Sequence, residues 1–188
     1  MLNKAVRMYG QNDLRLDTFE LPEIKDDEIL VKVISDSICM SSYKAALQGS
    51  NHKRVPDNIS EHPAIIGHEF CGLIEKVGAK WADKFTVGEK FTIQPAISYK
   101  GTLMTPGYAF EYCGGDSQHA ILLPEIMEQD CLLDYKAKEF FYGSLSEPLS
   151  CIIGTFHAQY HTKPGCYVHE MGIREGGNMA ILAGAGPM

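Results

Sequence analysis

Three separated segments of the chain carry side chains that could hold a metal ion. They are residues 37–42 (SICMSS), 66–72 (IGHEFCG) and 146–150 (SEPLS). Three protein ligands that leave one position open for water or substrate make a catalytic zinc site. Spacing alone does not show that these residues meet, because any fold could hold them apart. The segments offer one thiolate, one imidazole and two carboxylates, from Cys39, His68, Glu69 and Glu147.

Each of these residues also has an ordinary structural interpretation. Taken alone, Cys39 is best read as a small buried thiol, and a His-Glu pair is usually satisfied on the surface or in the core. His68 and Glu69, however, lie between Ile-Ile-Gly and Phe-Cys-Gly, an apolar stretch in which a charge needs a partner. Metal ligation supplies that partner, so the three segments together favour a metal site.

The last residues carry a second chemical signal. Residues 178–183 (NMAILA) read as a buried strand, and Gly184 and Gly186 follow it as Gly-x-Gly. This is the opening of the dinucleotide-binding fingerprint, whose glycines let backbone N–H groups approach a pyrophosphate at the start of the next helix. The third glycine, that helix and the later acidic residue are not in the sequence. A plain glycine turn is an equally good interpretation of the motif alone.

The elements that would position these segments are mostly strands, and the pattern changes near residue 143. A short helix is predicted over Ser41–Leu47, and Pro148–His161 has apolar residues at helical spacing. The run Glu28–Ile34 is apolar on both faces, which predicts a central strand. The predicted strands before residue 143 are Lys4–Gly10, Leu14–Leu21, Glu28–Ile34, Gly67–Gly78, Phe91–Pro95 and Ser117–Pro124.

Composition narrows the class of protein. The 188 residues are 45% apolar, as in an ordinary globular protein, and contain no apolar run of about 18 residues. The formal charge of −7 argues against nucleic-acid binding, although an acidic protein can place a few cations where an anionic substrate sits. The first residues lack the apolar core of a signal peptide, and the six cysteines form no Cys-x-x-Cys pair. We therefore expect a cytoplasmic protein with reduced cysteines and no membrane partner.

The three segments, in this order and followed by Gly-x-Gly, resemble the zinc-dependent medium-chain dehydrogenase/reductase superfamily. The Glu-Pro-Leu-Ser element is similar to the polyol dehydrogenases, the relatives of sorbitol dehydrogenase. The longer segments DSICMSSYKAA, IIGHEFCG and GSLSEPLSC are similar to those of the L-sorbose 1-phosphate reductases. The resemblance covers essentially the whole chain. It implies a mainly β fold with a few helices: a GroES-like, partly open β-barrel over residues 1–145, then a connecting helix and the first strand of a truncated Rossmann domain over 146–188.

The resemblance also implies roles for individual residues. Cys39 and His68 match the zinc ligands, and Glu69 matches a carboxylate that binds zinc in some states and supports the site in others. Glu147 matches the third catalytic position, which binds zinc or its water. Ser41 matches the hydroxyl that relays a proton from the substrate oxygen. Zinc would polarise that oxygen, and NAD(H) or NADP(H), held partly by Gly184 and Gly186, would carry the hydride.

The sequence departs from this family pattern at several positions. Ser42 stands where many relatives have an aspartate, so any support that this position gives to a zinc-bound imidazole must be made differently. Lys44 stands where several relatives have a relay histidine. The family's structural zinc needs four close cysteines after Phe91–Pro95, where this chain has only Cys113. We therefore expect one catalytic zinc and no structural zinc.

For each of three features, two interpretations stay open. Lys44, and separately the basic pair Lys53 and Arg54, could attract a substrate phosphate, but solvated surface positions are preferred for both. The aromatic, glycine-rich segment Gln94–Gly115 is either a lobe at the mouth of the site, with tyrosines lining a sugar pocket, or a packed surface lobe.

The sharpest functional hypothesis is a zinc-dependent oxidoreductase that interconverts a ketose phosphate and a polyol phosphate, such as L-sorbose 1-phosphate and D-glucitol 6-phosphate. The full-length protein is expected to be a homo-oligomer, and this chain alone to be inactive without a complete nucleotide-binding domain. One alternative is an unphosphorylated polyol or threonine-type dehydrogenase. Another is a GroES-like binding module without catalysis, but such a module has no need of the open metal site that Cys39, His68 and Glu147 would form.

Overall fold

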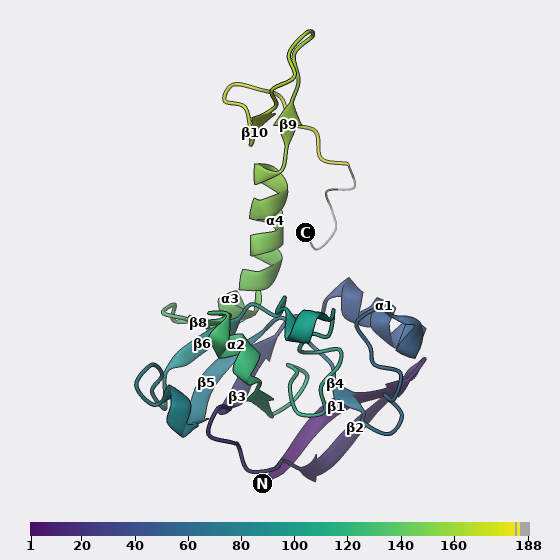
Figure 1. Cartoon of the computed structure of the whole chain (residues 1–188), viewed down its shortest axis with the longest axis vertical. Helices are drawn as coiled ribbons and strands as arrows, with labels where there is room; N and C mark the ends of the chain where they lie inside the picture. Colours follow the sequence, from purple (N-terminus) through teal and green to yellow (C-terminus); the bar gives the residue numbers. More distant parts are fainter. Residues whose placement is uncertain (183, 185–188) are drawn as a thin grey trace. The chain divides into compact units, whose positions relative to one another are not determined.

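The computed structural model describes residues 1–182 and 184, so Gly186 of the predicted fingerprint lies outside the described residues. The chain divides into two compact units, of which the first is Met1–Leu145 and the second begins at Ser146. Figure 1 labels their helices and strands. Among the described residues, no helix is long and apolar enough to cross a membrane.

A five-stranded sheet forms the larger part of the first unit. Its strand order is β7-β3-β5-β6-β8, and every neighbouring pair is antiparallel. The predicted central strand is confirmed, because β3 is paired on both sides and its residues Ile29 and Val31 are fully buried. The strands are β3 (Ile29–Asp36), β5 (Phe70–Val77), β6 (Lys90–Ile93), β7 (His119–Leu122) and β8 (Leu132–Asp134).

A three-stranded antiparallel sheet completes the first unit, in the order β2-β1-β4. The predicted hairpin is confirmed: β1 (Leu2–Gly10) turns into β2 (Asp13–Glu20), and β4 is the short strand Ala64–Ile65. A bridge between Ala5 and Ser117 joins this sheet to the segment that enters β7. The two sheets together make the mainly β fold of the GroES-like, partly open barrel that the family resemblance implies.

Short helices connect the strands of the first unit. The predicted helix after β3 is α1 (Met40–Gln48), and the 3-10 turn Gly49–Asn51 continues it. The helix α3 (Phe140–Ser144) packs against β3 and β5, close to where the chain passes into the second unit. The remaining short helices of the first unit are α2 (Pro124–Glu128) and the 3-10 turns Ala79–Trp81 and Tyr99–Gly101.

Two clusters of buried side chains hold the first unit together. One fills the five-stranded sheet and includes Phe70, Phe91 and Leu122. The other gathers Met8, Ala45 of α1, Val55, Ile66 and Tyr108, together with three further residues. Burying each large apolar side chain contributes about 1.5–3 kcal/mol. The second cluster therefore fixes α1 and the lobe that carries Tyr108 against the chain that enters β5.

The link between β4 and β5 requires a glycine. Gly67 has φ +88°, and a Cβ on it would lie 2.0 Å from Asp36 Oδ2 and 2.7 Å from the backbone nitrogen of Asp116. Both the backbone conformation and the space therefore exclude a side chain at this position. The tight turn fixes the backbone just before His68.

The second unit differs in two places from the sequence prediction. The helix predicted to reach His161 is α4 (Ser146–His157), and it ends earlier because β9 (Tyr160–His161) pairs with β10 (Glu170–Met171). The strand predicted over 178–183 is wrong for residues 178–182, which form no regular element and are exposed; residue 183 lies outside the described part. A buried parallel strand needs paired strands beside it, and none of the described strands pairs with these residues.

The crowding at Gly67 can be separated from its backbone strain. Gly88 has a similar φ of +90°, but nothing lies within 4 Å of a Cβ placed on it. We expect Gly88→Ala to cost about 1–3 kcal/mol of unfolding free energy, from backbone strain alone. Gly67→Ala should cost about 1–3 kcal/mol more, because Asp36 and Asp116 must shift. Urea unfolding of both variants measures the difference, and equal losses would contradict this account of the turn.

Candidate metal centre

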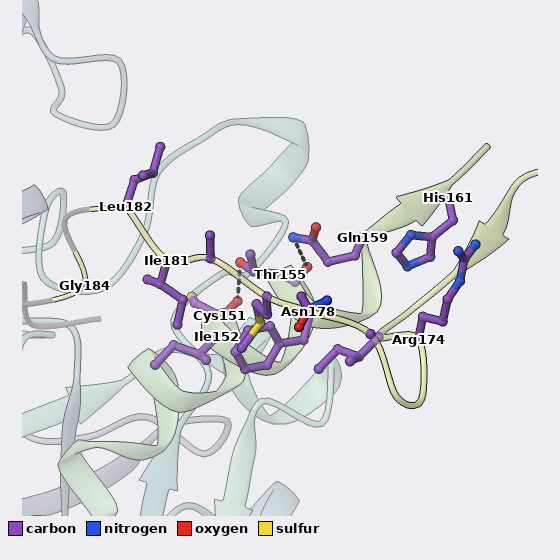
Figure 2. Close-up of a pocket in the computed structure, with 15 residues that line it drawn as sticks. Cys151, Ile152, Thr155, Gln159, His161, Arg174, Asn178, Ile181, Leu182 and Gly184 are labelled. Atoms are coloured by element: carbon purple, nitrogen blue, oxygen red, sulfur yellow. Dashed lines mark hydrogen bonds between the residues drawn. The ribbon is translucent and has the colours of Figure 1, made fainter. Parts of the chain in front are cut away.

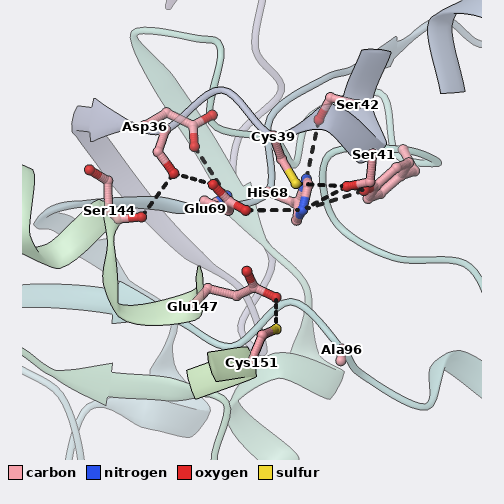
Figure 3. A network of polar contacts seen from close by, with 12 residues as sticks. Asp36, Cys39, Ser41, Ser42, His68, Glu69, Ala96, Ser144, Glu147 and Cys151 are labelled. Carbon is pink, nitrogen blue, oxygen red and sulfur yellow. Dashed lines mark hydrogen bonds and ion pairs between the residues drawn. The ribbon is translucent and has the colours of Figure 1, made fainter. Parts of the chain in front are cut away.

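The first unit brings three of the predicted ligands together. Cys39 is the residue immediately before α1, and His68 and Glu69 lie immediately before β5. Their ligand atoms, the Cys39 Sγ, a ring nitrogen of His68 and a carboxylate oxygen of Glu69, all lie within 4.8 Å of one another (Figure 3). We call these residues the metal centre. Segments about 30 residues apart in the sequence meet because β3 and β5 are antiparallel neighbours.

The donor set fits a zinc ion. Tetrahedral zinc at about 2.0–2.3 Å from sulfur, nitrogen and oxygen ligands holds those atoms roughly 3.5 Å apart, so a small inward movement would complete the site. The His68 and Glu69 side chains are only 5% and 4% exposed, and His68 Nε2 lies 3.7 Å from Glu69 Oε1. A buried carboxylate needs a cation or hydrogen-bond donors, and a bound metal would meet that need.

The two ring nitrogens of His68 face different partners. Nδ1 lies 3.3 Å from the hydroxyl of buried Ser42, whereas Nε2 lies 3.4 Å from Ser41 Oγ on the side of the metal centre. With a metal on Nε2, the Nδ1–H donates to Ser42, which thereby orients the ring. Ser42 is thus placed to orient the ring of a metal-bound His68. Burial lowers the pKa of His68, with the Glu69 charge opposing, which favours the neutral ring that a metal requires.

Hydrogen bonds also orient Glu69. The Ser37 hydroxyl donates to Glu69 Oε2, and the Glu69 backbone N–H donates to Asp36 Oδ1 at 3.1 Å. The other oxygen of Asp36 is buried and has no hydrogen-bond partner among the described residues. Burial, and then the nearby Asp116 carboxylate, raise the pKa of Asp36 to about 8. The raised pKa favours the neutral carboxyl group, so Asp36 can stay buried without a charge while its first oxygen holds the Glu69 backbone.

A pair of hydroxyl groups continues from the metal centre. Ser41 Oγ donates to the Cys39 Sγ at 3.0 Å, and the Tyr108 hydroxyl donates to Ser41 Oγ at 2.7 Å. Tyr108 is fully buried, and its hydroxyl is also 3.4 Å from His68 Nε2. Sequence reasoning considered that tyrosines of the 94–115 lobe could line the site but did not choose one. The lobe approaches closely because Gly107 has no side chain: a Cβ there would lie 2.2 Å from the Gly67 carbonyl oxygen.

This architecture has a known counterpart. Residues 25–127 match the alcohol dehydrogenase GroES-like domain family, over more than half of the chain. The chain belongs to this family. The GroES-like match includes β3, α1, β5 and the lobe that carries Tyr108, and hence every residue of the metal centre.

Two curated relatives match almost the whole chain. The L-sorbose 1-phosphate reductase of Klebsiella pneumoniae is 51% identical over 184 residues, which are 98% of this chain and 45% of that protein. The mannitol-1-phosphate 5-dehydrogenase of Aliivibrio fischeri is also 51% identical over 184 residues, 98% of this chain and 43% of that protein. The chain thus spans less than half the length of these relatives.

A solved structure shows the same fold. The 2R,3R-butanediol dehydrogenase of Bacillus subtilis superimposes with a TM-score of 0.66 at 22% identity, covering 82% of this chain and 46% of that one. The two structures share the arrangement of their sheets and helices. The GroES-like fold assigned from the sequence match is therefore also seen in the structure.

The remaining predicted residues are not members of this cluster of three. Glu147 is in the first turn of α4, in the second unit, where the Cys151 thiol donates to its Oε1 at 3.6 Å. Lys44 is exposed on α1 and has no contact with the metal centre among the interactions of the described residues. Cys113 is fully buried in the GroES-like core, where burial raises its pKa to about 12. It is therefore a neutral core thiol.

The second unit has a pocket of its own. It lies between α4 and the segment that runs to Gly184, and Figure 2 shows side chains of Thr155, Gln159 and Asn178 around it. All its lining residues belong to the second unit, and none is a member of the metal centre. Of the predicted cofactor-binding residues, Gly184 lines this pocket and Gly186 is not described.

The metal centre can be tested by metal content. We expect the zinc-supplied, reduced protein to bind about one zinc per chain, and His68→Ala to lose it because a three-ligand set is broken. Elemental analysis after gel filtration measures the zinc. The matched control is His62→Ala, since His62 is 59% exposed and pairs with Glu111 away from these ligands. Equal zinc in wild type and His68→Ala would rule out this centre.

Asp36 provides a second test of the same site. We expect Asp36→Ala to weaken metal binding by about 10- to 100-fold, because the Glu69 backbone loses its acceptor. Asp36→Asn keeps that oxygen and should stay within a few-fold of wild type. Competition with a coloured chelator measures both affinities. If the two variants bind zinc equally well, Asp36 has no orienting role.

Proposed function

We propose that this chain is the zinc-binding part of a nicotinamide-dependent oxidoreductase that interconverts a polyol phosphate and a ketose phosphate. The observation that carries the proposal is the meeting of Cys39, His68 and Glu69 with a hydroxyl pair at their edge. Thiolate, imidazole and carboxylate are a zinc donor set, and the hydroxyls supply a route for a proton. The sugar-phosphate enzymes named above, at 51% identity, support the substrate class.

The proposed zinc ligands have different roles. Cys39 and His68 would hold zinc in the GroES-like unit, Glu69 would bind it directly or support it, and Glu147 of the second unit would provide the third catalytic position. When bound, zinc supplies a Lewis acid that stabilises negative charge on a substrate oxygen. We expect a single catalytic zinc.

Ser41 is the proposed proton carrier. In the direction of ketone reduction, its hydroxyl gives a proton to the substrate oxygen as hydride reaches the neighbouring carbon. The Tyr108 hydroxyl, which already donates to Ser41 Oγ at 2.7 Å, replaces that proton and is itself reprotonated from solvent, so no charge stays on the tyrosine. Burial raises the pKa of Tyr108, so it remains a protonated donor at neutral pH. In the direction of alcohol oxidation the proton moves along the same two hydroxyls in reverse.

The remaining parts of the proposal concern the whole protein. Residues 146–188 would begin a nucleotide-binding domain, with Gly184 and Gly186 in its phosphate-binding turn and NAD(H) or NADP(H) as cofactor. The six cysteines are all free thiols, which supports a reducing compartment such as the cytoplasm. The family resemblance implies that the full-length protein is a homo-oligomer.

The reaction can be tested on the full-length protein that carries these residues. We expect NAD(P)H-dependent reduction of L-sorbose 1-phosphate, followed by absorbance at the nicotinamide band. Ser41→Ala should lower kcat by about 10²- to 10⁴-fold, as for loss of a general acid, while zinc content stays unchanged. Glu147→Gln should weaken zinc binding or turnover.

The matched control is Ser98→Ala, because Ser98 is exposed and its side chain is not part of the metal centre. Turnover that persists in a zinc-free protein would reject the metal mechanism. Efficient turnover of free sorbitol, but not of sugar phosphates, would favour the unphosphorylated polyol alternative. Zinc binding with no turnover of any polyol would favour a binding module.

A further inference from the structure

A short basic segment lies beside Tyr108. Residues 52–54 (HKR) follow the 3-10 turn that extends α1, and His52 and Arg54 are half-buried whereas Lys53 is exposed. The next residue, Val55, is buried in the same cluster as Tyr108. Because Val55 anchors the backbone, the side chains of the segment are held near the metal centre and do not extend freely into solvent.

The ring of Tyr108 connects this segment to the metal centre. The His52 ring stacks on it at 5.7 Å between centroids, with an interplanar angle of 9°. The Arg54 Cζ lies over the same ring, 5.5 Å from its centroid, and the His68 ring centroid is 4.9 Å away. The guanidinium of Arg54 and the ring of His68 therefore both contact the Tyr108 ring. A ligand bound at the Tyr108 and Ser41 hydroxyls would lie close to that guanidinium.

Arg54 has no anionic partner of its own. Within the part of the chain that the structure describes, no carboxylate lies at ion-pair distance from its guanidinium, and its contacts are the Tyr108 ring and the backbone bond to His52. The protein has 24 acidic and 17 basic side chains, so partners were available. A half-buried arginine left without one is suited to an anion that arrives from outside.

The local hydrogen bonding presents donors to such an anion. The Arg54 backbone N–H donates to His52 Nδ1 at 3.3 Å. In the neutral ring this leaves the proton on Nε2, which becomes a second donor next to the guanidinium. The planar fork of arginine binds a phosphate through two parallel hydrogen bonds. Together these groups can neutralise and orient a phosphate ester.

We propose that Arg54, assisted by His52, binds the phosphate group of a phosphorylated open-chain polyol or ketose whose carbinol or carbonyl oxygen lies at the metal centre. The inference rests on the proposed function and deepens it, because it names the residues that select phosphorylated over free sugars. It also replaces the preference for a solvated Lys53–Arg54 pair: only Lys53 is solvated in that way, whereas Arg54 is held over Tyr108.

Direct binding tests the site without relying on turnover. Isothermal titration of the zinc-loaded, full-length protein with D-glucitol 6-phosphate and with D-glucitol gives the preference for the phosphate ester. We expect about 10- to 100-fold tighter binding of the phosphate ester, as for hydrogen bonds to a charged group. Arg54→Gln should remove most of this preference, and Arg54→Lys should retain part of it, since the charge remains but the fork is lost.

The matched control is Arg15→Gln, because Arg15 is an exposed arginine that pairs with Asp13 on the β1–β2 hairpin. It should leave the preference unchanged, and zinc content and melting temperature should be the same in all variants. The inference is overturned if Arg54→Gln keeps the full preference, or if wild type binds glucitol and its phosphate equally well.

Turnover assays of the same variants separate this inference from the proposed function. Sugar-phosphate turnover with an unaltered KM in Arg54→Gln would leave the function standing and overturn the phosphate site. Phosphate-dependent binding that requires Arg54, in a full-length protein that transfers no hydride, would reject the function and leave the anion site standing.

Discussion

The burial of His68 and Glu69 side by side is the constraint on which the first unit depends. Neither group can be removed from water without partners, and the surrounding elements supply them. The Ser42 hydroxyl contacts the Nδ1 of His68, and the Ser37 hydroxyl donates to the Glu69 carboxylate. Asp36 accepts a hydrogen bond from the Glu69 backbone N–H. These donors and acceptors lie on β3, on α1 and on the segment between them. The antiparallel pairing of β3 with β5 is therefore both the centre of the sheet and the origin of the site.

Close backbone contact makes this arrangement possible. Gly67 turns the chain into His68 with no room for a side chain, and Gly107 lets the lobe with Tyr108 reach the same turn. The result is a buried tyrosine whose hydroxyl meets Ser41 and whose ring meets His52 and Arg54. One side chain thus connects the proposed proton route to the proposed phosphate site, so a change at Tyr108 would affect both.

The two units contribute unequally to what the structure shows. The GroES-like unit has a packed core and hydrogen bonds that orient three of the four predicted ligands. The second unit carries Glu147 on α4 and the glycine turn, but residues 178–182 are exposed and unpaired with any described strand. A parallel strand depends on neighbours for its backbone hydrogen bonds, which explains why its apolar sequence alone did not produce one.

The sequence by itself determined six of the eight strands of the first unit, all but the short β4 and β8, and also the central position of β3. It also identified Cys39, His68 and Glu69 as candidates. Alternation, turn residues and a charge inside an apolar stretch are local signals, and family resemblance added the ligand roles. The sequence could not show that Ser42 would face His68 Nδ1, that Tyr108 would be the tyrosine at Ser41, or that Arg54 would lie over it. These contacts join residues 26 to 67 positions apart, and only the packing of α1 and the lobe against the β5 entry decides them.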